Sequence, residues 1–262
     1  MAVGMVLVAA VAGLTVDGIY VDCENAKEAL RGNDMVNLVV GIPIMVIALW
    51  MTARGSTRGH LLWLAMTMYV MYGYAYYVFG PTFNSLFLLH VAIFSLSTVA
   101  LGFGLGAFDP TNLRPRWESS VLPRAVAIFL ILIVVTLIGS YAYETIRYST
   151  GGELPTDVLP FEEWRVHLGY ALDLSIIAPA SIIAAVLLWK NSTWGYPIAA
   201  ILLIFLAVFQ LNFLGSALFM DAAGIEGVEQ AIPQAIASTV VFAIPAVLLT
   251  WGVSRPPATF TS

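Results

Sequence analysis

Apolar runs of about 20 residues recur along the whole 262-residue chain, and they constrain its fold more than any other feature. A helix of that length crosses the ~30 Å hydrocarbon layer of a bilayer and keeps its backbone polar groups hydrogen-bonded. Charged residues make up 10% of the chain, against roughly 25% in soluble domains. The sequence therefore predicts an all-α, multi-pass membrane protein whose first partner is the lipid bilayer.

Eight membrane-spanning helices are expected from these runs. Their predicted limits are 2–20, 35–53, 60–80, 85–107, 123–146, 165–189, 196–220 and 233–253. The first segment has the length of a signal peptide. It lacks a positively charged start and a clear small-residue cleavage site, so we predict that it is retained as a span.

Two segments in different halves of the chain are similar. Residues 34–50 (DMVNLVVGIPIMVIALW) and residues 173–189 (DLSIIAPASIIAAVLLW) both begin with aspartate, contain proline and end with tryptophan. A cationic turn follows each of them, RGSTRGH at 54–60 and KNSTWGY at 190–196. This similarity favours an old internal duplication.

The predicted repeat divides the chain into four helices and four helices. Residues 1–107 would form the first half and residues 123–262 the second, with a polar, proline-containing cytoplasmic linker at 108–122. Because each half has an even number of spans, both enter the membrane with the same orientation. The two halves would then be related by an axis along the membrane normal.

The distribution of loop cations predicts the orientation in the cell membrane. The side that carries both termini has seven cations: Arg54, Arg58, Arg114, Arg116, Arg124, Lys190 and Arg255. The opposite side has four: Lys27, Arg31, Arg147 and Arg165. Cytoplasmic loops carry an excess of Lys and Arg, so both termini are expected in the cytoplasm.

Two aspartates head the similar segments, and a charge in a bilayer costs at least ~2.5 kcal/mol at mid-depth. Asp34 is expected at the outer start of the second span, as an N-cap or, with Asn37, as part of a small polar site. Asp173 would lie about nine residues, or ~13 Å, inside the sixth span, which is too deep for a cap. A tyrosine or Gln210 could hold it structurally, or it could carry a proton or bind a ligand.

Tyrosines in the third span and a histidine in the fourth add to the polar groups. Tyr69, Tyr72 and Tyr76 fall on one helical face. An interfacial aromatic belt explains the outermost rings, and a pocket or a buried carboxylate would explain the deeper ones. A lone histidine in a membrane span is more commonly a hydrogen-bonded structural residue than a ligand, and we expect the structural role for His90.

These polar residues fall in the outer halves of the predicted spans. The outer-half set is Asp17, Asp34, Asn37, Tyr72, Tyr76, Asn84, His90, Glu144, Asp173, Gln210 and Asn212. The inner halves are nearly featureless apolar sequence. The pattern predicts a pocket that opens outward, and its candidate site residues are Asp173, Asp34, Asn37, Tyr72, Tyr76, His90, Glu144, Gln210 and Asn212.

Several chemistries lack the residues that they need. The two lysines, Lys27 and Lys190, lie outside the predicted spans, which excludes a retinal Schiff base. One cysteine and three histidines make a closed metal site improbable, and no phosphate-binding loop or nucleophile elbow occurs. We therefore expect no metal, no cofactor and no nucleic-acid partner.

Three short segments of the first half resemble a family of uncharacterised prokaryotic multi-spanning integral membrane proteins. They are GNDMVNLVVGIP at 32–43, RGSTRG at 54–59 and FGPTFN at 79–84. The resemblance implies a membrane protein of that kind and no particular activity.

A second likeness is confined to PFEEW at 160–164, which is similar to the Pro-x-Glu-Glu pattern of membrane lycopene cyclases. That resemblance implies acids that protonate a polyene, but the pattern occurs once here instead of once in each half. Glu162 and Glu163 are also explained as first-turn acids at a helix N-terminus.

Three functions fit the sequence. The leading one is transport or binding of a small polar or cationic solute, with or without coupling to protons. The second is a membrane-embedded enzyme for a lipid or isoprenoid, with Asp173, Glu163 and His167 or His90 as acid and base. The third is an accessory subunit of an oligomer or membrane complex. The sequence favours a non-enzymatic role.

Overall fold

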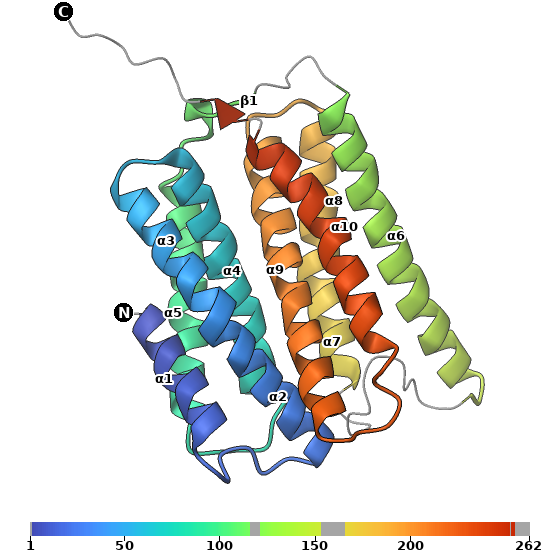
Figure 1. The fold of residues 1–262 in the computed structure, drawn as a ribbon. Coiled ribbons are helices and arrows are strands. Elements are labelled where there is room, and N and C mark those ends of the chain that lie inside the picture. Colours follow the sequence, from blue (N-terminus) through green and yellow to red (C-terminus); the bar gives the residue numbers. More distant parts are fainter. Residues whose placement is uncertain (1, 116–120, 153–165, 252, 255–262) are drawn as a thin grey trace, which may run out of the picture.

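A computed structural model describes residues 2–115, 121–152, 166–251 and 253–254 of the chain as a bundle of long helices (Figure 1). The first half contains α1 (Ala2–Thr15), α2 (Glu24–Val36), the π-helix η1 (Asn37–Gly41), α3 (Ile42–Ala53), α4 (Thr57–Phe79) and α5 (Phe87–Gly106). The second half contains α6 (Leu122–Ser149), α7 (Val166–Leu172), the π-helix η4 (Asp173–Ile177), α8 (Ala178–Trp189), α9 (Gly195–Ala222) and α10 (Ala231–Trp251).

The prediction of an all-α, multi-pass membrane protein is confirmed at this level. Six helices of the described residues are long and apolar enough to cross a membrane: Glu24–Ala53, Phe87–Gly106, Leu122–Ser149, Leu168–Trp189, Gly195–Ala222 and Ala231–Thr250. The 23-residue α4 is long enough but falls outside this set, because its five tyrosines and the polar residues of its first turn lower its hydropathy.

The predicted first span, 2–20, is wrong in its outer limit. The helix α1 ends at Thr15, and Gly18 then adopts a left-handed φ of 78° that a helix cannot continue through. At ~1.5 Å per residue its 14 residues are about 21 Å long, less than the ~30 Å hydrocarbon layer. By itself, α1 is too short to cross the bilayer.

Short connections close one end of the bundle. Gly55 and Asn191 end α3 and α8 with φ angles of 74° and 51°, and a Ser56 hydroxyl that accepts from the Gly59 amide at 3.2 Å caps α4. The described part of the predicted linker includes the 3₁₀ turn η2 (Pro110–Asn112) and the two-residue strand β1 (Arg114–Pro115), which pairs antiparallel with β2 (Val253–Ser254). Residues 116–120 lie outside the described residues.

The exposed carboxyl group of Asp109 opens the turn η2. The Thr111 amide and hydroxyl donate to it at 2.9 and 2.7 Å, and these hydrogen bonds hold the pKa of Asp109 below its ordinary value. The turn η2 therefore has its own polar cap, as expected for a connection outside the membrane.

The two π-helical segments correct the register of the sequence comparison. Asn37 and Asp173 open η1 and η4, and Pro43 and Pro179 are the second residues of the helices that follow. Each opening residue lies seventeen positions before the cationic turn that begins at Arg54 or Lys190. Counted from the turns, the counterpart of Asp173 is therefore Asn37 and not Asp34.

The helices α4 and α9 form the centre of the bundle and pack against each other. Both are largely buried along their length, and one hydrophobic core extends across the two halves. Figure 1 shows α1, α3 and α5 on one side of this central pair and α6, α8 and α10 on the other. The polar face of α4 thus lies in the interior of the bundle.

The helices α2 and α9 approach each other closely at two glycines. A Cβ atom on Gly32 would overlap the backbone of Gly215, and one on Gly215 would lie 2.6 Å from the Val36 side chain. Small residues allow helix backbones to meet in this way inside membranes. The contact fixes α2, and with it Asp34, against the central helix.

We predict that Gly32→Ala destabilises the folded protein by roughly 1–3 kcal/mol, because backbone atoms of α9 must move to admit the methyl group. Thermal unfolding in detergent micelles measures this loss. The matched control is Gly139→Ala on α6, where a Cβ atom has open space. Its stability should stay the same or rise slightly, because alanine favours a helix over glycine. Equal effects of the two substitutions would contradict the close contact.

Candidate functional site

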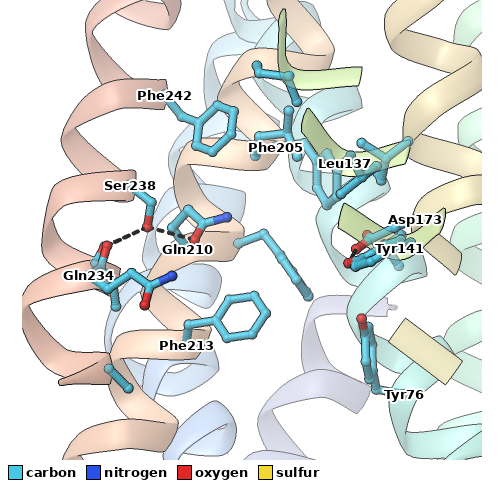
Figure 2. A pocket seen from close by; sticks show the side chains of 17 residues that line it. Tyr76, Leu137, Tyr141, Asp173, Phe205, Gln210, Phe213, Gln234, Ser238 and Phe242 are labelled. Atoms are coloured by element: carbon cyan, nitrogen blue, oxygen red, sulfur yellow. Dashed lines mark hydrogen bonds between the residues drawn. The ribbon is translucent and has the colours of Figure 1, made fainter. Parts of the chain in front are cut away.

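A cavity of about 280 Å³, termed here the larger cavity, lies between α4, α6, η4, α9 and α10 (Figure 2). Its lining residues are Tyr72, Tyr76, Ile133, Leu137, Tyr141, Asp173, Ile177, Phe205, Leu206, Phe209, Gln210, Phe213, Ala231, Gln234, Ala235, Ser238 and Phe242. The lining is mostly apolar and aromatic, with a few polar groups on opposite walls. Small-molecule sites in proteins commonly have this composition.

The carboxyl group of Asp173 is the acidic group of the larger cavity. It accepts hydrogen bonds from the Tyr72 hydroxyl of α4 and, at 2.6 Å, from the Tyr141 hydroxyl of α6. The Tyr141 ring stacks on Tyr170 at 3.8 Å between centroids, which fixes its position. Asp173 opens the π-helix η4, and single π-helical turns inside α-helices are frequent at functional sites.

The opposite wall of the larger cavity carries neutral polar groups. The Ser238 hydroxyl lies 2.9 Å from Gln210 Oε1 and 2.9 Å from the Gln234 carbonyl oxygen. Because a hydroxyl has one proton, it donates to one of these acceptors at a time. Figure 2 shows the carboxamide ends of Gln210 and Gln234 across the cavity from Asp173 and Tyr141.

Aromatic rings form much of the wall between these polar ends. Phe205, Phe209, Phe213 and Phe242 all line the larger cavity. The Tyr72 ring meets Phe209 edge to face, with centroids 4.9 Å apart and an interplanar angle of 89°. Phe209 and Phe213 form a second edge-to-face pair at 5.7 Å. The cavity therefore offers aromatic rings and a carboxyl group to a bound molecule.

A smaller cavity of about 80 Å³ lies next to the larger one, and Tyr76, Phe209 and Phe213 line both. Its other lining residues are Asn33, Asn37, Tyr69, Gly73, Tyr74, Tyr77, Asn212 and Ser216. The Tyr69 hydroxyl lies 2.7 Å from Asn37 Oδ1 and 3.0 Å from Asn212 Oδ1. Its single proton serves one of these two carbonyl oxygens at a time.

The interpretation of Asp34 as an N-cap is wrong. The helix α2 begins at Glu24, ten residues earlier, and the Asp34 side chain is buried inside the bundle with 1% of its surface exposed. The Tyr20 hydroxyl donates to Asp34 Oδ2 at 2.6 Å, and the Tyr77 hydroxyl donates to Oδ1 at 2.9 Å. A Cβ atom on Gly13 of α1 would overlap this carboxyl group, so a glycine makes room for it.

His90 and Glu144 also differ from expectation. His90 is fully buried beside the rings of Tyr74 and Tyr77, and its nitrogens have no hydrogen-bond partner among the described residues. The expected hydrogen-bonded structural histidine is therefore not found. Glu144 pairs with Arg147 on its own helix at 3.4 Å and lines neither cavity. It does not belong to the predicted pocket.

The structure brings together part of the predicted site. Asp173, Tyr72, Tyr76 and Gln210 line the larger cavity, while Asn37, Asn212 and again Tyr76 line the smaller one. Asp34, like His90 and Glu144, lines neither, although Tyr77 joins Asp34 to the smaller cavity.

The sequence reasoning missed Gln234 and Ser238 altogether. They lie four positions apart on α10, which places them on one face of that helix. Two polar side chains at that spacing in a largely apolar span could have been recognised in the sequence.

The aspartates of the site lack cationic partners among the described residues. No described lysine, arginine or histidine forms an ion pair with Asp173 or Asp34; the ion pairs found join Lys27, Arg31 and Arg147 to glutamates. The described residues also contain no group of three or more His, Cys, Asp or Glu that could hold a metal ion. The larger cavity can thus supply one acidic group, neutral amides and aromatic rings.

Comparisons with models of protein families, with curated proteins and with solved structures found no match to this chain. The geometry of the two cavities is therefore the basis on which a function can be inferred.

The paired rings of Tyr74 and Tyr77 offer a direct test of the Asp34 contacts. They stack at 5.0 Å, yet the Tyr77 hydroxyl has two acceptors and the buried Tyr74 hydroxyl has no partner among the described residues. We predict that Tyr77→Phe destabilises the protein by roughly 1–3 kcal/mol, because it leaves a buried carboxyl group short of a donor. Tyr74→Phe should cost clearly less, because no described residue hydrogen-bonds to its hydroxyl. Thermal unfolding of both variants measures the difference, and a larger loss for Tyr74→Phe would refute the assignment.

Proposed function

We propose that the protein binds a small organic cation in the larger cavity and transports it across the cell membrane. The observation that carries this proposal is the Asp173 carboxyl group, which faces an aromatic cavity and has no cationic partner among the described residues. A carboxylate inside a membrane is costly when it is unpaired. A cationic solute would supply the missing charge.

The aromatic wall supports a cation over a neutral solute. Faces of phenylalanine and tyrosine rings attract ammonium groups, by ≈0.5–1 kcal/mol at exposed sites and ≈2 kcal/mol or more where water is excluded. The Tyr72 hydroxyl bonds to Asp173, and the Tyr72 ring contacts Phe205 and Phe209, which line the same cavity. Quaternary and protonated amines are the ligand class that combines a positive charge with apolar substituents.

The volume of the larger cavity and the polar wall opposite Asp173 restrict the class of solute further. A volume of about 280 Å³ lies just below the roughly 300–1,000 Å³ that is typical of small-molecule sites. Gln210, Gln234 and Ser238 can hydrogen-bond a polar group at the far end of a molecule whose ammonium group lies near Asp173. The preferred solute is thus a small amine with one neutral polar substituent.

The transport part of the proposal includes the finer architecture. We propose eight spans, in which α4 and α1 join the six apolar ones and the loop with the buried Ile19 and Tyr20 extends the short α1 across the layer. They are arranged as a parallel repeat of four and four with both termini in the cytoplasm. The paired π-helical segments, the matching prolines and the turns at Arg54 and Lys190 support the repeat. The larger cavity lies where α4 of the first half meets α6, α9 and α10 of the second. Rocking of one half against the other would open such a site to alternate sides.

The two alternatives fit the geometry less well. For the enzyme, Asp173 lines the larger cavity, whereas His90 lines neither cavity. Glu163 and the side chain of His167 lie outside the described residues, as does the cyclase-like segment at 160–164. For the accessory subunit we expect polar residues that only join helices, while the described residues surround two cavities.

We predict that choline binds the detergent-solubilised protein more tightly than 3,3-dimethyl-1-butanol, its neutral isostere. Isothermal titration calorimetry should show that Asp173→Asn weakens choline binding about tenfold or more, which corresponds to ~1.4 kcal/mol. Binding of the isostere should not change. Tetraethylammonium and benzyltrimethylammonium extend the test to other sizes.

The matched control is Asp221→Asn, which removes an exposed acid near the end of α9 and should leave binding unchanged. Equal affinity for all three cations and the neutral isostere, or an unchanged affinity in Asp173→Asn, would refute the proposal. Uptake of radiolabelled choline into vesicles then separates transport from binding alone.

A further inference from the structure

The smaller cavity lies between two carboxyl groups that are each held by a pair of tyrosines. Tyr76 lines both cavities and so connects the smaller cavity to the site of Asp173. Tyr77 lines the smaller cavity and donates to Asp34. We propose that the smaller cavity holds water and forms a proton path from Asp173 to Asp34, which makes Asp34 a second, proton-carrying site. This inference rests on the proposed transport function and names its coupling ion.

The lining of the smaller cavity suits water. Its volume of about 80 Å³ exceeds the ~10–15 Å³ that one water molecule needs by this measure. The Tyr74 hydroxyl, on a side chain with 1% of its surface exposed, has no partner among the described residues. Asn37 and Asn212 add amide groups on facing helices. Buried water typically makes about three hydrogen bonds to polar groups of this kind.

The Asp34 end of the path accepts a proton without losing hydrogen bonds. The Tyr77 hydroxyl lies 2.9 Å from Asp34 Oδ1 and 3.3 Å from the Leu30 carbonyl oxygen. When Asp34 is ionised, Tyr77 donates to it. When Asp34 is protonated, Asp34 can donate to Tyr77, and Tyr77 turns its own proton to Leu30. A carboxyl group that keeps its hydrogen bonds both when ionised and when protonated is suited to carry a proton.

The groups that face Asp34 are nearly all uncharged. They are Tyr20 from the loop before α2, Tyr69, Tyr74 and Tyr77 from α4, and His90 from α5 beyond Tyr77, with Asp22 on the far side of Tyr20. Neither α1 nor the adjoining part of α9 presents a titratable side chain to it. Arg31, on α2 itself, pairs with Glu28 at 3.0 Å. A proton is therefore the cation available to neutralise Asp34.

The transfer conserves protons and involves no electrons. Asp173 releases one proton when an organic cation binds beside it. Each hydroxyl or water along the path accepts one proton and donates one. At the end of the path Asp34 accepts one proton, so the number of protons is unchanged. Tyr20 then connects Asp34 to the end of the bundle, where the neighbouring Val21 is 61% exposed. Proton and organic cation thus compete for Asp173, which couples their movements.

Infrared difference spectra of the full-length protein in lipid vesicles test the path. In the wild type, added choline should increase the carboxylic-acid C=O band that Asp34→Asn removes. Tyr76→Phe, which breaks the link between the cavities, should slow or reduce this increase at least fivefold. Tyr196→Phe is the matched control, because its hydroxyl bonds to the Leu249 carbonyl oxygen away from both cavities. It should behave as the wild type does.

The outcomes separate this inference from the proposed function. If choline binds but the Asp34 band does not respond, or responds equally in Tyr76→Phe, the proton path is refuted and the binding function stands. If neither choline nor the other ammonium ions bind, the proposed function fails, and a titration without ligand decides about the path. The proposed path would couple the two carboxyl groups, and coupled groups titrate as a pair, so Asp173→Asn should then shift the pH midpoint of the Asp34 band by about half a unit or more. No shift would overturn the inference.

Discussion

The hydrogen bonds from tyrosine hydroxyls to the buried Asp34 and the half-buried Asp173 are the interaction on which the interior of this protein depends. Inside a bilayer an unpaired carboxylate is costly, and the described residues offer neither aspartate a cation. The helix α4 supplies one hydroxyl to each, from Tyr77 to Asp34 and from Tyr72 to Asp173. This explains why the least apolar long helix lies at the centre of the bundle.

The second tyrosine bonded to each aspartate comes from outside α4 and connects its own segment to α4 through the carboxyl group. Tyr20 belongs to the loop between α1 and α2, and Tyr141 belongs to α6. Each aspartate is therefore held from two directions, but with different surroundings. Asp34 is enclosed by α1, α2 and α4, whereas Asp173 faces an open volume. The same chemical arrangement thus gives a closed site suited to a proton and an open one suited to a larger cation.

The difference between the closed site of Asp34 and the open site of Asp173 comes from the packing of the helices around them. Gly32 and Gly215 let α2 lie directly against α9. Around the larger cavity, phenylalanine and glutamine side chains of α9 and α10 meet α4 and α6 without filling the space between them. The cavities share an aromatic wall of Tyr76, Phe209 and Phe213, so a movement of these rings would affect both.

The sequence by itself determined the membrane class, the helical fold and the presence of polar residues within it, because apolar length and charge depletion are local properties of the chain. It also pointed to Asp173, Tyr72, Tyr76 and Gln210, since polar groups in apolar runs are conspicuous. Only the tertiary structure decided which of these groups meet. The start of α2 at Glu24, which turned Asp34 from a cap into a buried acid, depends on packing against α1 and α9 in a segment of low hydropathy. Likewise, Glu144 and Tyr141 are close on one helix, but only Tyr141 lines the larger cavity. Which of the two side chains reaches the cavity depends on how α6 packs against its neighbours.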